Sequence, residues 1–79
     1  MPAPKPEIGI IYEVRKDPDG RWIVARADEP IGAFPRRSAA VGQACRAARQ
    51  ESATTDIKVI VYVVENGKRA KEWEGSAIS

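Results

Sequence analysis

The sequence predicts an α+β domain of ββαββ order, in which one helix packs on one face of a four-stranded antiparallel sheet. Two pairs of segments with apolar residues at every second position each flank a turn signal, which is the pattern of a β-hairpin. Between the hairpins lies one stretch of helical periodicity whose apolar positions are small residues. We expect a single domain over residues 8–74, between a disordered Pro-rich tail at 1–7 and a disordered tail at 75–79.

The first hairpin joins two expected strands, at residues 8–15 and 21–27, through an Asp-Pro-Asp-Gly turn. Pro18 presets φ for the second position of a type I turn, and Gly20 suits the left-handed position that follows. The larger apolar residues of the two strands are expected to share one face of the sheet: Tyr12, Val14, Trp22 and Val24.

The segment between the first hairpin and the helix is expected to be a loop. Pro30, Gly32 and Pro35 punctuate residues 28–35 and leave no regular alternation. Phe34 is the one large apolar residue near the end of this loop, where it is expected to close one end of the core.

The helix is expected to begin at Arg36 or Ser38 and to end near Glu51. Its apolar stripe follows the spacing i, i+3, i+4 and i+7 and consists of small side chains, which allow a close approach to a sheet. The residues of the stripe are Val41, Ala44, Cys45 and Ala48. Cys45 is therefore expected to be a small buried hydrophobe rather than a reactive thiol.

The second hairpin contains the most apolar segment of the chain. Residues 57–65 are apolar on both faces and rich in β-branched side chains, as is typical of a strand in the interior of a sheet. Asn66-Gly67 follows, and this dipeptide suits the two left-handed positions of a tight hairpin turn. Residues 68–74 are mostly charged, which suits an edge strand.

The strand at 57–65 is expected beside the strand at 8–15 and antiparallel to it, in a sheet of order 2-1-3-4. The alternative places it beside the strand at 21–27 and parallel to it, where it is less well buried. A single helix covers only one face of such a sheet, so an apolar patch remains on the other. We expect this patch to meet a second copy in a homodimer, or another protein partner; its residues are Ile11, Ile23, Ile60, Tyr62 and Val64.

Composition excludes several kinds of active site. The chain has no histidine and one cysteine, which removes Cys/His zinc sites, Ser/His/Asp triads, Cys/His dyads and any disulfide within the chain. We therefore expect a protein that is not an enzyme, with no catalytic residue, no metal site and no cofactor. The lone cysteine favours a cytoplasmic location. The longest apolar run, at 59–64, is too short to span a membrane, so no membrane association is expected.

Nucleic-acid binding is the second candidate function. Arginines on the helix and just before it are candidates to contact phosphates in a stripe, and they are Arg36, Arg37, Arg46 and Arg49. On the sheet, Tyr62 with Trp22 or Trp73 is a candidate surface for stacking bases. The formal net charge of +2 is only a weak bias toward such a ligand, so protein interaction is the first expectation.

A layout of core and turn residues extends over about residues 10–73. It consists of Tyr12-x-Val14, Gly20, Trp22-x-Val24, Phe34, Ala40-Val41 with Ala44, and Asn66-Gly67-Lys68-Arg69. On these residues the chain resembles a family of small bacterial proteins known only as a domain of unknown function. The chain departs from that family at Arg36, where the family has a capping threonine. The resemblance implies a fold and a bacterial cytoplasmic setting, and no activity.

A second likeness concerns the first hairpin and the helix alone. These elements look similar to the partial double-stranded-RNA-binding-like fold of toxin-neutralising HicB antitoxins. Such antitoxins usually carry a separate DNA-binding segment, and nothing after Trp73 is long enough to be one.

Overall fold

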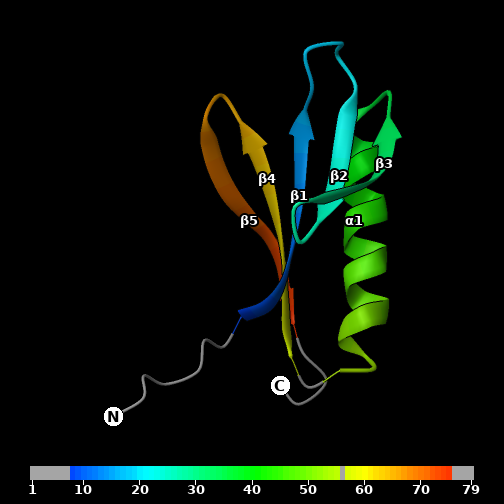
Figure 1. The fold of residues 1–79 in the computed structure, drawn as a ribbon, viewed down its shortest axis with the longest axis vertical. Coiled ribbons are helices and arrows are strands. Elements are labelled where there is room, and N and C mark those ends of the chain that lie inside the picture. Colours follow the sequence, from blue (N-terminus) through cyan, green and yellow to red (C-terminus); the bar gives the residue numbers. More distant parts are fainter. Residues whose placement is uncertain (1–7, 56, 76–79) are drawn as a thin grey trace.

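The structure, a computed structural model, describes residues 8–55 and 57–75. Within them, one helix lies on one face of a five-stranded sheet whose strand order is β3-β2-β1-β4-β5 (Figure 1). The elements in chain order are β1 (Ile8–Lys16), β2 (Trp22–Arg26), β3 (Glu29–Phe34), α1 (Arg37–Ser52), β4 (Lys58–Glu65) and β5 (Lys68–Gly75). The predicted tails at 1–7 and 75–79 lie outside the described residues, apart from Gly75 at the end of β5.

The α+β class is confirmed, but the predicted four-stranded antiparallel sheet is wrong. Residues 29–34, expected as part of a loop, form β3 and pair antiparallel with β2. The chain reverses through a two-residue turn in which Ala27 and Asp28 both have positive φ, 51° and 71°. Pro30 is tolerated because β3 is an edge strand with a register shift at this point, where a missing N–H removes little from the ladder.

The additional strand reverses the direction of the strands that follow it. β4 lies beside β1, as expected, but the two strands are parallel and not antiparallel. Three strands precede the helix instead of two, so α1 returns the chain to the end of the sheet where β1 begins. The register places Ile11 opposite Ile60 and Val14 opposite Val63. β2, β3 and α1 thus form the long connection that parallel pairing of β1 with β4 requires.

The two predicted hairpin turns are confirmed in their geometry. The Asp17 carbonyl oxygen accepts the Gly20 N–H at 3.0 Å, and Gly20 has a φ of 88°. The Asp17 Oδ1 atom also accepts the backbone N–H of Arg21 at 2.9 Å. In the second turn, Asn66 and Gly67 have φ values of 52° and 76°. Both turns lie at the same end of the molecule, at the top of Figure 1.

The core lies between α1 and the face of the sheet that the helix covers. The helix contributes three fully buried alanines, and the sheet contributes larger apolar side chains. These residues are Ala40, Ala44, Ala48, Tyr12, Val14, Val24, Val59, Val61 and Val63. Trp22, Phe34, Val41 and Cys45 pack at the margin of this core and are partly buried. Small helix residues against β-branched strand residues allow the two layers to approach closely.

The last turn of α1 is tied to the sheet by Glu51. Arg26 of β2 donates to its carboxylate twice, from Nε to Oε1 at 3.0 Å and from Nη2 to Oε2 at 2.5 Å. The hydroxyl of Tyr12, a residue in the core, donates to the same Oε1 at 2.5 Å. Burial and this hydrogen bond raise the pKa of Tyr12, while the Arg26 guanidinium holds the pKa of Glu51 below its usual value. Sequence periodicity gives no signal for this network, because its residues come from three separate elements.

Candidate functional site

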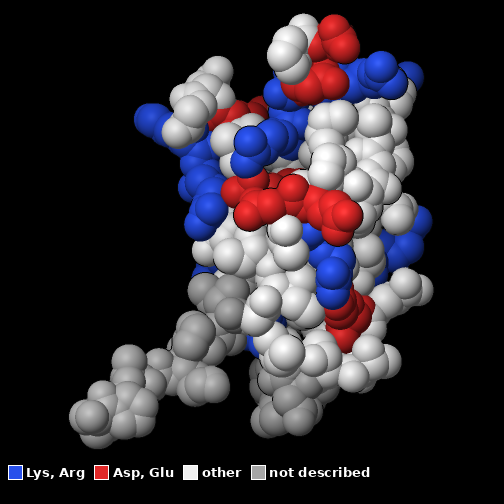
Figure 2. All heavy atoms as spheres, in the orientation of Figure 1, with Lys and Arg blue, Asp and Glu red and all other residues white. Residues whose placement is uncertain are grey.

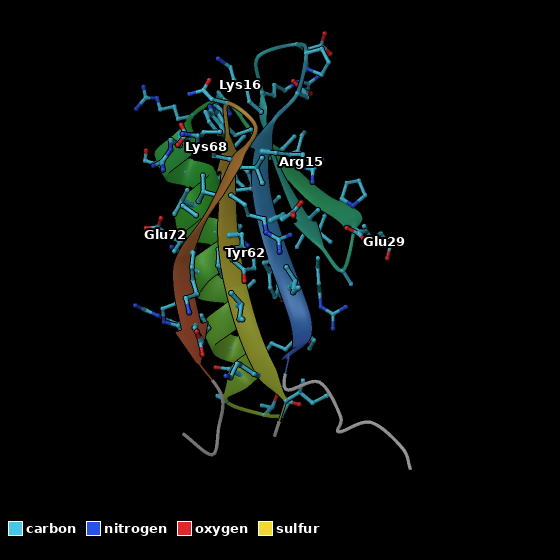
Figure 3. The ribbon with its side chains drawn as sticks, turned by 90° about the vertical axis from the view of Figure 1, so that its left-hand side faces the viewer. Arg15, Lys16, Glu29, Tyr62, Lys68 and Glu72 are labelled. Carbon is cyan, nitrogen blue, oxygen red and sulfur yellow. The ribbon has the colours of Figure 1, made fainter. Side chains whose placement is uncertain are left out.

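The face of the sheet that α1 leaves open is the first candidate site. Figure 3 views this face, with the helix behind the sheet. Four of the five apolar residues expected there are partly exposed: Ile11, Ile23, Tyr62 and Val64. Ile60 is only 3% exposed and lies in register opposite Glu74 of β5. The open face is therefore less apolar than the sequence pattern indicates.

Glu13 lies on the open face, in register between β2 and β4, and holds two arginines. Its carboxylate forms ion pairs with Arg15 and with Arg69, whose Nη1 lies 3.2 Å from Oε2. The Arg69 guanidinium also lies 4.2 Å from the ring centroid of Tyr62, within range of a cation–π attraction. Partial burial raises the pKa of the Glu13 carboxyl, but the two guanidinium groups outweigh burial and hold the pKa below its usual value. A carboxylate neutralised in this way is a poor general base at neutral pH.

Two shallow hollows flank Glu13 on the open face. One of about 270 Å³ lies toward the start of β1, and one of about 180 Å³ lies toward β2 and β3. Glu13 and Asp28 line both of them. The other lining residues are Gly9, Ile11, Ala27 and Arg69 in the first, and Arg15, Ile23, Ala25 and Pro30 in the second. Hollows of this size suit the side chains of a partner surface better than a cofactor.

The four arginines expected to contact phosphates do not form one stripe. Arg36 precedes α1 and Arg37 begins it, and the Arg37 Nε lies 3.2 Å from Oε2 of Glu65. Arg46 is nine residues further along the helix, about 180° around the axis and about 14 Å along it from Arg37. Arg46 and Arg49 are both exposed. The set is therefore divided into a pair at the start of α1 and a pair further along it.

The start of α1 belongs to a basic end of the molecule that sequence reasoning missed. Between the β1–β2 and β4–β5 turns, a cavity of about 390 Å³ opens at this end. Its lining residues are Arg15, Lys16, Trp22, Val64, Glu65, Asn66 and Gly67. The Lys16 Nζ lies 6.0 Å from the ring centroid of Trp22. Basic residues flank both turns in the sequence, but only the pairing of β1 with β4 shows that the turns are neighbours.

The described residues offer few groups for cysteine or metal chemistry. Cys45 is a free, partly buried thiol. Burial and the nearby Glu72 raise its pKa, so the less nucleophilic thiol form dominates at neutral pH. Within residues 8–55 and 57–75, no group of three or more His, Cys, Asp and Glu side chains could hold a metal ion.

In the part of the chain that the structure describes, no helix combines the length and the apolar character needed to cross a bilayer.

Comparison of the chain with protein-family models, with curated proteins and with solved structures finds no match. The resemblances to the bacterial family of unknown function and to HicB antitoxins therefore stay predictions.

Proposed function

We propose that this protein is a protein-interaction module that forms a homodimer through the open face of its sheet. The supporting observation is that α1 covers one face alone, while the other presents partly exposed apolar side chains, among them Ile23 and Tyr62. Such side chains gain free energy when a second surface removes them from water.

The size of the open face sets the expected strength of the dimer. Five strands of five to nine residues, about seven on average and spaced about 4.8 Å apart, give a face of about 19 by 24 Å. Two such faces bury roughly 900 Å² in total, slightly below the roughly 1,000 Å² of a stable specific interface. We therefore expect a dimer that dissociates in the micromolar range rather than an obligate one.

The charges of the open face favour packing against a second copy. Glu13 is already neutralised by Arg15 and Arg69 within each copy, so burying this cluster leaves no unpaired carboxylate. Lys71 of β5, in register with Tyr62, is likewise held by Glu74 within the chain. A two-fold axis parallel to β1 places the β5 side of one copy over the β2–β3 side of the other and so gives an isologous interface.

Sedimentation equilibrium over a wide concentration range tests this proposal. The Ile23→Glu variant puts a charge on the open face and Tyr62→Ser removes an aromatic contact, so both are expected to stay monomeric where the unmodified protein dimerises. Ile31→Glu is the matched control, because Ile31 is 51% exposed but lies on the edge strand β3. Circular dichroism establishes that each variant is folded.

Two outcomes contradict the proposal. A protein that sediments as a monomer at every concentration does not form the dimer. A dimer that Ile31→Glu abolishes, and that Ile23→Glu and Tyr62→Ser leave intact, pairs through the edge of β3 and not through the open face.

A further inference from the structure

Three segments that are far apart in the sequence meet at the end of the domain that carries the β1–β2 and β4–β5 turns (Figure 1). Trp22 pairs with Phe34, Arg15 pairs with Val64, and Arg37 forms an ion pair with Glu65. The segments are 15–22, 35–38 and 64–69, and we refer to them together as the hairpin end. They contain seven Lys and Arg residues and three Asp and Glu residues, a net charge of +4 in a chain whose total is +2. The rest of the chain is therefore net acidic, and the charge is polarised toward this end.

Part of this positive charge is already neutralised within the domain. Arg15 and Arg69 are bound to Glu13, and Arg37 is bound to Glu65. Four other cations of the hairpin end form no ion pair with the residues that the structure describes: Lys16, Arg21, Arg36 and Lys68. Figure 2 shows several Lys and Arg side chains at this end of the molecule, together with acidic side chains at its tip.

The hairpin end also has a cavity with an aromatic wall. The cavity of about 390 Å³ between the two turns is lined on one side by Lys16 and Trp22 and on the other by Val64, Glu65, Asn66 and Gly67. Its volume falls in the range of small-molecule sites, which is about 300–1,000 Å³. Glu65 is the one carboxylate in the lining, and its ion pair with Arg37 offsets its charge.

We propose that the hairpin end binds single-stranded nucleic acid, with one base in the cavity against Trp22 and flanking phosphates held by Lys16, Arg21, Arg36 and Lys68. Cations that lack an internal partner attract a polyanion without first breaking an ion pair. An aromatic wall beside those cations is the combination by which proteins hold single strands, through stacking of bases and contacts to the backbone. A narrow cavity between two turns suits an unpaired base, whereas a duplex keeps its bases inside the stack.

This proposal does not rest on the homodimer. Trp22 belongs to the covered side of the sheet, and Lys16, Arg21, Arg36 and Lys68 lie at one end of the strands rather than on the open face. Val64 and Arg15 line the cavity and also border the open face, so the nucleic-acid measurement includes a chain that does not dimerise. Failure of one proposal leaves the other standing, because dimerisation is measured without nucleic acid and nucleic-acid binding is measured with the monomeric Ile23→Glu variant as well as with the unmodified chain.

Fluorescence anisotropy of a labelled single-stranded oligothymidine at low salt tests the proposal. The double variant Lys16→Gln/Arg36→Gln is expected to weaken binding by about tenfold, and to reduce the slope of log K against log salt by about 1.4, since about 0.7 is lost for each phosphate contact to a single strand. The matched control is Arg46→Gln/Arg49→Gln, which removes the same charge from α1 outside the hairpin end. It is expected to change affinity by less than twofold.

A second readout reports on the cavity itself. In a Trp73→Phe variant, the intrinsic tryptophan fluorescence comes from Trp22 alone. Stacking of a base on Trp22 quenches this fluorescence, so titration with oligothymidine is expected to quench it, with a dissociation constant that matches the anisotropy value.

The proposal is overturned if the oligothymidine does not bind at low salt, or if the two double variants lose affinity equally. It is also overturned if a duplex of the same length binds more tightly than the single strand, or if polyglutamate, a polyanion without bases, binds equally well. Unchanged Trp22 fluorescence at saturation would show that no base stacks in the cavity.

Discussion

Replacing Glu51 by alanine should remove a large part of the stability of this domain. Glu51 accepts three hydrogen bonds, two from Arg26 and one from the hydroxyl of Tyr12. Without this acceptor, the largely buried donor of Tyr12 is unsatisfied, which costs about 1–3 kcal/mol. Loss of the partly exposed Arg26 pair adds less, because solvent screens it. The loss from Tyr12 alone, about 1–3 kcal/mol, is a large fraction of the roughly 3–5 kcal/mol available to a domain of this size.

Urea unfolding followed by tryptophan fluorescence measures this loss. With a slope of about 1 kcal/mol per molar urea, the midpoint of Glu51→Ala should fall by about 2 M. Glu51→Gln keeps an acceptor for Tyr12 and should lose only about 1 kcal/mol. The control is Glu65→Gln, which breaks the exposed, single-contact pair with Arg37 and should cost less than about 0.5 kcal/mol.

A double-mutant cycle of Tyr12 and Glu51 tests whether their hydrogen bond contributes to stability as described. Tyr12→Phe should be costly in the unmodified protein and nearly neutral in the Glu51→Ala background, because the hydrogen bond is then already lost. If Tyr12→Phe costs the same in both backgrounds, or if Glu51→Ala costs no more than Glu65→Gln, the network does not hold the helix to the sheet as described.

The same network fixes how stability depends on pH. A carboxyl whose pKa is lower in the folded state stabilises that state above its unfolded pKa and loses this contribution as the pH falls. For Glu51 the contribution is full above the ordinary value of 4.5 and is lost below it. Tyr12 has the opposite sign, because its pKa is raised from 10.0, so its contribution is full below pH 10.0 and is lost above it. The difference in stability between the unmodified protein and Glu51→Gln should therefore be constant near neutral pH and shrink in acid.

Three substitutions and one reactivity measurement test the packing of individual residues. Gly9→Ala would place a Cβ against Cγ2 of Ile57 and 2.8 Å from the Ile57 Cβ, so it should cost about 1–3 kcal/mol in urea unfolding, a loss that Ile57→Ala reduces but does not abolish; an unchanged midpoint contradicts that contact. Ala44→Leu adds volume at a fully buried position and should cost about 1–3 kcal/mol and lower the melting temperature; unchanged melting would mean that the helix does not lie close to the sheet. Gly42→Ala meets nothing within 4 Å and should raise stability by about 1 kcal/mol, whereas a loss would reveal a contact at this face. Cys45 should react with a thiol reagent more slowly than free cysteine at neutral pH, because its pKa is raised; an equal rate contradicts its burial.

The parts of the fold that the sequence predicts are those with a strong local signal. The helical spacing of Ala44 and Ala48 predicts buried helix positions, and both are fully buried. The Asn66-Gly67 and Gly20 turns follow from their need for positive φ, and both are present. The placement of residues 57–65 beside the first strand follows from their apolar character on both faces, and β4 does lie next to β1.

The missed strand β3 explains the wrong topology. Its residues are mostly exposed, so no apolar alternation marks it, and Pro30 and Gly32 are residues that usually indicate a loop. The turn before it uses Ala27 and Asp28 at positive φ, where Asn-Gly or Asp-Gly is the usual signal. The additional strand before the helix reverses the direction in which β4 runs. β1 and β4, which were expected to be antiparallel, are therefore parallel.

The candidate sites were predicted only where a pattern within one strand or one helix marks their residues. The apolar residues of the open face follow from period-two alternation, but the Glu13–Arg15–Arg69 cluster does not, because Arg69 is 56 residues from Glu13. Spacing along one element predicts a stripe of Arg36, Arg37, Arg46 and Arg49, of which only Arg36 and Arg37 belong to the hairpin end. Their grouping with Lys16, Arg21 and Lys68 depends on which strands are neighbours, and no local pattern encodes that.

The most direct test of the proposed open-face dimer is an isotope-filtered nuclear Overhauser experiment on a mixture of ¹³C-labelled and unlabelled copies. At concentrations above the dissociation constant, the ring protons of Tyr62 in one copy should show contacts to methyl groups of Ile23 or Val64 in the other. Intermolecular contacts that come only from Ile31 and its neighbours on β3, or no intermolecular contacts at any concentration, would contradict the assignment of this face.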